Sequence, residues 1–270
     1  MKLALTSCKL ATITESRLND KHAIINAQLK EVGIPLRYQL FFGADKQHFN
    51  QIPLVAKDVV GIKVFMGCST GDLVIDDDES LHAVFDIAAK NNLIVAVHAE
   101  DEDLLKQSKH NYKGPMAYAA HSVIRNIEVA RYAVEKAINL TRKYGTRLYI
   151  LHVSSMAEIA LIKAAKAEGL PVFAETTPHH LFLDESAYAN LQGRAVVNPP
   201  LRLQENHLAH KYFSELSWLY YAVQCYERSQ DNNFSPFLRR MLKVRRCIFH
   251  SENLPRIFQP PVYILPSNLH

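Results

Sequence analysis

The sequence has little cysteine and lacks the close cysteine pairs of disulfide-stapled or zinc-finger proteins. Its four cysteines stand far apart in 270 residues and form no CxxC pair. This spacing fits a reducing compartment better than a disulfide framework. No apolar run approaches the roughly 18 residues of a membrane-spanning helix, and too few residues precede Cys8 for a secretory signal peptide. We therefore expect a cytoplasmic protein that is not integral to a membrane.

The excess positive charge is confined to the end of the chain. The net charge is +4, and residues 201–270 contain nine Lys and Arg against five Asp and Glu. A basic cluster at 239–246 is compatible with a nucleic-acid patch. Because no nucleic-acid-binding motif accompanies it, a solvated helical face or an unstructured basic tail is favoured, and no nucleic-acid partner is expected. Residues 194–270 also contain no glycine, so the tail differs in composition from the rest.

Short β-rich runs alternate with amphipathic helical patterns in residues 1–200, which predicts βα units around a parallel sheet. Helices are expected at 80–91, 121–144 and 156–168. No GxGxxG or GxxxxGK loop occurs, which disfavours a doubly wound nucleotide-binding sheet relative to a barrel. The expected strands are 36–42, 62–66, 93–98, 147–152 and 171–175.

Polar residues interrupt or end several of these apolar runs. Lys63 stands inside one expected strand, although a charged amine resists burial unless it is paired, neutral or modified. His98, His152 and Glu175 each end a strand, at the rim where (β/α)8 enzymes assemble their sites. A strand-end histidine taken alone is more often a hydrogen-bonded core residue than a metal ligand, and Lys63 has the alternative of extending its amine to water.

Five segments stand in order along the chain: GIKVFMGCSTG, VAVHAE, LYILHVSS, AETTPHHLFL and VVNPPLR. Together they resemble the dihydroorotase branch of the cyclic amidohydrolases, with dihydropyrimidinase and allantoinase as close relatives and further alternatives. The resemblance runs from about Thr12 to Arg202. It implies that Lys63 is carboxylated by carbon dioxide and bridges zinc through its carbamate, and that His98 and His152 are imidazole ligands.

The same resemblance implies zinc-dependent hydrolysis of a small cyclic amide. The family reaction is the reversible conversion of N-carbamoyl-L-aspartate and L-dihydroorotate, and three protein ligands plus water are typical of catalytic zinc. Asn198 resembles a substrate-contacting residue, and Glu175 and His179 lie beside the site as candidate substrate-binding residues. Alternatively, Glu175 pairs with a basic side chain. The turn that contains His179 also has an alternative interpretation, in which its role is purely structural.

The family pattern is incomplete at both ends of the chain. No HxH pair occurs, and after Arg202 the only aspartate is Asp231, in a polar, turn-like setting rather than at a strand end. We therefore expect an α/β protein with a partial (β/α)8 TIM-type barrel that lacks its first, second and last strands. Residues 1–202 form this barrel, truncated at its N-terminus, and residues 203–270 form the divergent basic tail.

Two functional hypotheses follow from the sequence. The first is a dihydroorotase-type amidohydrolase with at most one well-supported zinc ion and with Lys63 as the catalytic carbamate. The second is a non-catalytic fragment or subunit of that family, which the missing HxH pair and aspartate favour. Such a partial barrel exposes sheet edges, so pairing with a second copy or with another chain is an alternative to a monomer.

Overall fold

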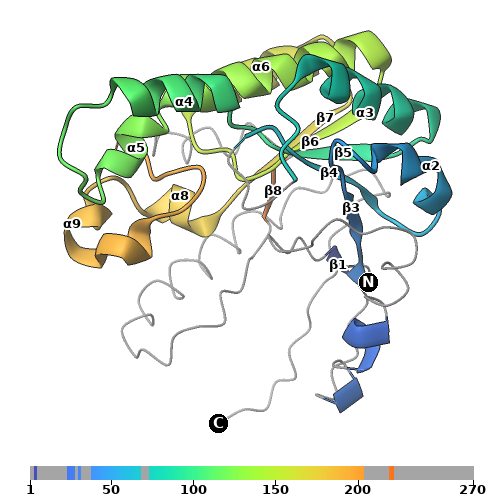
Figure 1. The fold of residues 1–270 in the computed structure, drawn as a ribbon, viewed down its shortest axis with the longest axis horizontal. Helices are drawn as coiled ribbons and strands as arrows, with labels where there is room; N and C mark the ends of the chain where they lie inside the picture. The colour runs from blue at the N-terminus through green and yellow to red at the C-terminus, as the bar shows by residue number, and fades with distance from the viewer. Residues whose placement is uncertain are drawn as a thin grey trace.

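A parallel sheet with helices along one face organises the described part of the chain (Figure 1). The computed structural model describes residues 3–4, 23–27, 30–31, 38–67, 73–203 and 219–221. The six-stranded sheet has the order β3-β4-β5-β6-β7-β8, and each neighbouring pair is parallel. Its strands are β3 (Phe41–Gly43), β4 (Gly61–Phe65), β5 (Ile94–His98), β6 (Arg147–Ile150), β7 (Val172–Thr176) and β8 (Leu219–Tyr221).

The sheet confirms the predicted α/β class, and the expected strands from 62 to 175 appear within one or two residues. The expected strand at 36–42 is divided into β2 (Tyr38–Gln39) and β3, and β2 pairs with β1 (Leu3–Ala4) in a separate two-stranded sheet. The tail adds one strand that the sequence pattern did not predict. This is β8, whose Leu219 lies opposite Ala174 of β7, so the sheet continues by one strand beyond the expected set.

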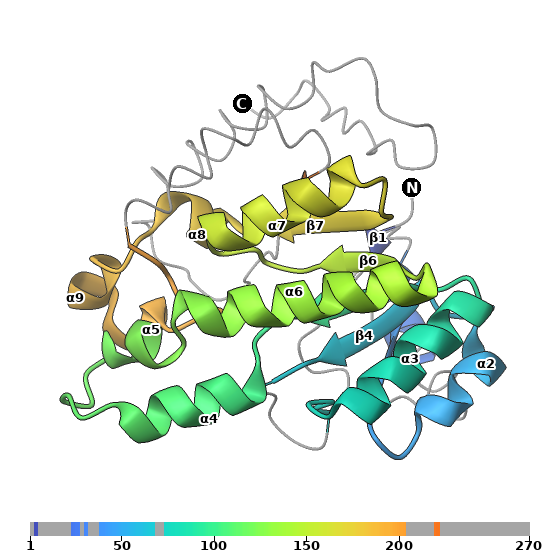
Figure 2. The same cartoon turned by 90° about the horizontal axis from the view of Figure 1, so that it is seen from above.

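Helices cover one face of the sheet, and the main hydrophobic core lies between these two layers (Figure 2). Ile62 and Val64 of β4 are fully buried in this core together with Phe85 and Val134 of the helices. Burial of each such side chain contributes about 1.5–3 kcal/mol relative to exposure. The helices are α2 (Ile52–Val55), α3 (Asp78–Lys90), α4 (Glu102–Asn111), α5 (Ala120–Ile124), α6 (Ile127–Tyr144), α7 (Met156–Ala167), α8 (Pro178–Phe182) and α9 (Ala187–Leu191).

The single helix expected at 121–144 is in fact two helices, α5 and α6. Asn126 has an extended backbone, with φ −64° and ψ 174°, and its side-chain oxygen accepts from the backbone N–H groups of Glu128 and Val129. An asparagine that caps a helix in this way starts a new helix rather than continuing the old one. The helical spacing of apolar residues across the boundary concealed this break.

The face of the sheet opposite the helices, here called the inner face, carries the polar residues of interest. Side chains alternate between the two faces of a strand. Val97 and Ile150 belong to the core under the helices, whereas Phe41, Ala96 and Leu151 form a second cluster, against which Tyr149 packs. Strand alternation therefore places Lys63, His98, Tyr149 and Glu175 on the inner face.

Candidate functional site

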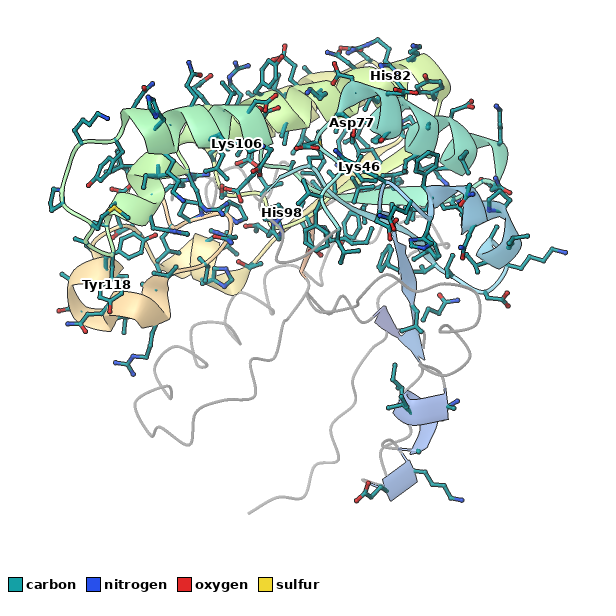
Figure 3. The ribbon with its side chains drawn as sticks, viewed as in Figure 1. Lys46, Asp77, His82, His98, Lys106 and Tyr118 are labelled. Carbon is teal, nitrogen blue, oxygen red and sulfur yellow. The ribbon has the colours of Figure 1, made fainter. Side chains whose placement is uncertain are left out.

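The predicted site residues come together at the carboxyl ends of neighbouring parallel strands. Lys63 lies on β4, His98 is the last residue of β5, and Glu175 lies near the end of β7. His152 follows β6 by two residues, with a left-handed backbone at φ 42°. His98 and Glu175 are each only 4% exposed. Figure 3 shows His98 near the middle of the fold, beneath the helical layer.

His98 and His152 face one another directly. The Nδ1 atom of His98 lies 3.0 Å from Nε2 of His152, and the ring centroids are 4.8 Å apart. Burial, followed by the electrostatic influence of His98, Lys63, His180 and His179, holds the pKa of His152 well below its usual value. His152 is therefore neutral at physiological pH, which is the form of imidazole that binds metals.

Lys63 lies on the same face with its amine over an aromatic ring. Its Nζ is 4.0 Å from the centroid of the Phe65 ring and 3.4 Å from the carbonyl oxygen of Val64. The positive charge of Lys63 lowers the pKa values of both His152 and Glu175, so the amine is electrostatically coupled to both. Lys63 therefore lies on the inner face within electrostatic range of His152 and Glu175.

Glu175 is a buried carboxyl group whose ionisation lies near neutrality. Burial raises its pKa to about 7, while the hydroxyl of Tyr149, the charge of Lys63 and the backbone of His152 act in the opposite direction. Tyr149 donates a short hydrogen bond to Oε2 of Glu175. Sequence reasoning missed Tyr149, although its place two residues before Leu151, on the inner face, was available as a signal.

A buried ion pair supports His98 from behind and was also missed. Glu100 is 0% exposed, and its Oε2 lies 2.8 Å from Nε2 of His98 and 2.5 Å from a guanidinium nitrogen of Arg125. Glu100 belongs to the VAVHAE segment, which the sequence identified only through its histidine. Arg125 lies between α5 and α6, so only the fold brings it to this position.

The candidate substrate-binding residues divide into two groups. Asn198 is exposed, and its side-chain oxygen lies 3.0 Å from Nε2 of His121, a residue that sequence reasoning did not include in the site. His179 is half-buried, and burial lowers its pKa to about 4. Its neighbour His180 is held between Thr177 and the carbonyl oxygen of Pro199. The predicted turn is in fact the start of helix α8. His180 has a structural role there, while His179 is a neutral imidazole whose electrostatic influence reaches His152.

The donor set fits a metal only in part. The described residues contain no group of three or more His, Cys, Asp or Glu side chains that could hold a metal ion. Two imidazole nitrogens bound to one tetrahedral zinc ion at about 2.0–2.1 Å are about 3.3 Å apart, and the facing nitrogens of His98 and His152 are 3.0 Å apart. These two nitrogens are hydrogen-bonded to each other at a spacing close to that of two ligands of one ion, and Lys63 could supply a third protein ligand only as a carbamate.

An outer hollow is separate from these residues. It has a volume of about 430 Å³ and lies between α3 and α6, where it is lined by His82, Tyr132, Lys136 and Lys143, among others. Figure 3 places His82 on the outer helical layer, away from His98. The titratable side chains that lie near one another are on the inner face instead, so the candidate functional site is there and not in the outer hollow.

The fold and the inner-face residues define an α/β protein of the barrel type with a histidine site at the strand ends. Over about half of its length the chain is a homologue of the cyclic amidohydrolases, the family of dihydroorotases and hydantoinases. It is 32% identical over 146 residues to a dihydroorotase from Methanosarcina acetivorans, covering 52% of this chain and 31% of that protein. It is 34% identical over 163 residues to a D-hydantoinase from Streptomyces coelicolor, covering 58% and 34%.

Solved structures of the same family share the fold. The L-hydantoinase from Arthrobacter aurescens superposes with a TM-score of 0.67 at 24% identity, over 77% of this chain and 46% of that chain. The dihydroorotase from Saccharomyces cerevisiae gives a TM-score of 0.66 at 16% identity, over 91% and 71%. No family model matches the chain. The chain spans about a third of the length of the curated relatives it matches.

None of the helices in the described part of the chain combines the length and apolarity needed to cross a membrane. The four cysteines, Asp231 and the basic cluster at 239–246 lie outside the described residues. The predicted boundary between residues 1–202 and 203–270 therefore stays a prediction, because only residue 203 and β8 of the tail are described.

Proposed function

We propose that the chain is a metal-dependent cyclic amide hydrolase of the dihydroorotase or hydantoinase type, with one zinc ion held by His98, His152 and a carbamate on Lys63. The observation that supports this most strongly is the 3.0 Å approach of His98 Nδ1 to His152 Nε2 on the same face as Lys63. The homology to dihydroorotases and to a D-hydantoinase over about half the chain supports the same substrate class.

Lys63 can bind a metal ion only if its amine loses its positive charge, and carboxylation of the amine has this effect. A protonated amine repels a metal ion, whereas a carbamate supplies anionic oxygen donors of the kind that zinc accepts. When bound, zinc supplies a water of lowered pKa and polarises the substrate carbonyl. The low pKa of His152 keeps its imidazole available as a ligand across the physiological range.

Glu175 is the described residue best suited to move a proton in this site. Its carboxyl has a pKa of about 7 because it is buried, and an acid–base group works best with a pKa near the working pH. Tyr149 holds Oε2 in place through its hydroxyl. In this role Glu175 would take the place of a strand-end aspartate, to which Asp231 does not correspond.

Asn198 and His179 complete the proposal on the substrate side. His121 lies 3.0 Å from the side-chain oxygen of Asn198, so the amide NH₂ is the group that remains to donate to a substrate carbonyl. Neutral His179, with its pKa lowered to about 4, adds a hydrogen-bonding group without adding charge. Both residues would orient the ring amide of a small cyclic substrate.

A second candidate function is a non-catalytic relative that keeps the barrel's middle and pairs with another chain. The observation that favours it is the absence, among the described residues, of a group of three metal-binding His, Cys, Asp or Glu side chains. The absence of an HxH pair from the sequence points the same way. Metal binding separates this alternative from the enzyme.

Zinc content and turnover test the proposal together. The purified chain is supplied with zinc and bicarbonate, its zinc is counted by mass spectrometry, and hydrolysis of L-dihydroorotate and of hydantoin is followed. We expect about one zinc per chain and turnover, with both lost in Lys63→Ala and His152→Ala. The matched controls are Lys57→Ala and His110→Ala, which replace exposed residues of the same types. Zinc without turnover would refute the enzyme, and no zinc would leave the non-catalytic relative.

A further inference from the structure

His98 has hydrogen-bonding neighbours on both sides of its ring. Nε2 lies 2.8 Å from Oε2 of Glu100, and Nδ1 lies 3.0 Å from Nε2 of His152. A neutral imidazole carries one proton, so one ring nitrogen donates and the other accepts. The group that faces Nε2 therefore decides which nitrogen offers a lone pair toward His152.

Glu100 is fixed as an acceptor by its surroundings. It is fully buried, and the same Oε2 that faces His98 is 2.5 Å from the guanidinium of Arg125. A carboxylate paired with a guanidinium only accepts hydrogen bonds. Nε2 of His98 must then carry the proton, and Nδ1 keeps its lone pair on the side where His152 and Lys63 lie.

The ion pair is itself anchored to the loop that carries His152. Arg202, the last residue of the VVNPPLR segment, donates a short hydrogen bond to the carbonyl oxygen of Arg125. Its Nε also donates to the hydroxyl of Ser154 at 3.2 Å. Arg202 is thereby bonded both to the residue that clamps Glu100 and to the segment two residues after His152. The buried Glu100–Arg125 pair, which contacts His98, is thus connected through Arg202 to the segment that carries His152.

We propose that Glu100, clamped by Arg125, is a positioning residue that selects the Nε2–H tautomer of His98 and so presents Nδ1 as a metal ligand. This inference rests on the proposed function for the identity of the metal site, while the tautomer is a property of the metal-free chain. Carboxylates that accept from the far nitrogen of a ligating histidine orient the ring and raise its basicity, and their loss lowers metal affinity about 10- to 100-fold.

The first measurement is the ¹⁵N NMR spectrum of metal-free protein at pH 8, with His98 assigned by comparison with His98→Gln. We expect an unprotonated Nδ1 and a protonated Nε2 in the wild type. In Glu100→Gln the bias toward this tautomer should weaken, because a neutral amide accepts less strongly than a carboxylate. A wild-type His98 with its proton on Nδ1 would overturn the proposal without any variant.

A double variant guards against misfolding of the single one. Glu100→Met with Arg125→Met removes the acceptor without leaving a buried charge unpaired, and such apolar replacements of buried pairs are often tolerated. The matched control is Glu135→Gln, another carboxyl that accepts from an arginine, in this case Arg131 on α6. The control should retain the wild-type tautomer and zinc affinity even if it unfolds at a lower temperature.

Zinc affinity is then measured by competition with a chromophoric chelator. We expect the dissociation constant to rise about 10- to 100-fold in Glu100→Gln and in the double variant, and to stay unchanged in Glu135→Gln. Unchanged affinity in both Glu100 variants would overturn the positioning role. If wild-type protein binds no zinc but shows the expected tautomer, the proposed metal site fails while the action of Glu100 on His98 stands, so the two failures are distinguishable.

Discussion

Replacing Lys166 by methionine should stabilise the protein at neutral pH. Lys166 lies in the last turn of α7, and its Nζ is buried with no hydrogen-bond partner in the part of the chain that the structure describes. Burial lowers the pKa of this amine to about 8 from its ordinary 10.5. The folded state therefore carries a charge in a place that disfavours it, and Lys166→Met keeps most of the length of the side chain without the charge.

The magnitude follows from the gap between the two pKa values. At about 1.36 kcal/mol per pKa unit, a fall from 10.5 to about 8 corresponds to about 3.4 kcal/mol. The side chain is partly exposed, so its stem allows the amine to reach toward water, and we reduce this figure to about 1–2 kcal/mol. Lys166→Met should raise the free energy of unfolding by that amount at pH 7.

The sign of the pH dependence is also determined. Between about pH 8 and pH 10.5 the unfolded chain holds the Lys166 proton while the folded chain has released it. The free energy of unfolding therefore rises with pH across this window, and the cost of the charge is fully present only below about pH 8. The advantage of Lys166→Met over the wild type should shrink steadily from pH 8 to pH 10.

Urea unfolding followed by circular dichroism at pH 7, 8, 9 and 10 measures this difference. Lys163→Met, an exposed lysine on the same helix, is the matched control and should stay within about 0.5 kcal/mol of the wild type at every pH. A Lys166→Met variant that is no more stable than wild type at pH 7, or whose advantage does not change with pH, would refute the reasoning.

Three further substitutions test how the helices and the site are held. Asp77→Ala removes the carboxylate that accepts from the backbone N–H of Ser80 at 2.7 Å, so urea unfolding should show a loss of about 1 kcal/mol. Asn126→Ala removes the cap of α6 and should cost about 1 kcal/mol in the same assay, with unchanged zinc affinity. Gly67→Ala would place a Cβ in steric conflict with the backbone carbonyl oxygen of Glu100. This substitution should lower the free energy of unfolding by about 1–3 kcal/mol and weaken zinc binding. Zinc affinity equal to that of the wild type would show that the backbone adjusts without moving Glu100.

Local patterns were sufficient for most of the sheet. The apolar run around Lys63 marked a strand, and in the structure Ile62 and Val64 lie in the core under the helices while strand alternation puts Lys63 on the opposite face. The same patterns gave the wrong helix boundaries where the hydrogen bonds of one side chain outweigh the periodic spacing of apolar residues. The polar contacts of Asn126 begin a new helix inside an unbroken apolar repeat, and β8 forms in a tail whose composition gave no strand signal.

The candidate site divides in the same way between local and distant determinants. Lys63, His98, His152 and Glu175 were found from sequence because each interrupts or ends an apolar run of its own strand. The partners of these residues were not found, because they come from other elements. Arg125 lies 25 residues after Glu100 in the chain, and no spacing rule links a helix break to a strand-end histidine.

The sequence by itself determined that this is a parallel α/β chain with an amine inside one strand and two imidazoles at the ends of others, since strand patterns and residue type are properties of short segments. Only the tertiary structure decided that His98 meets His152, that Glu100 and Arg125 hold the far side of His98, and that Tyr149 holds Glu175. Those contacts depend on the register between strands and on the approach of distant loops, and burial at these points decides which groups are neutral. Reactivity is set by that environment, which exists only once the chain has folded.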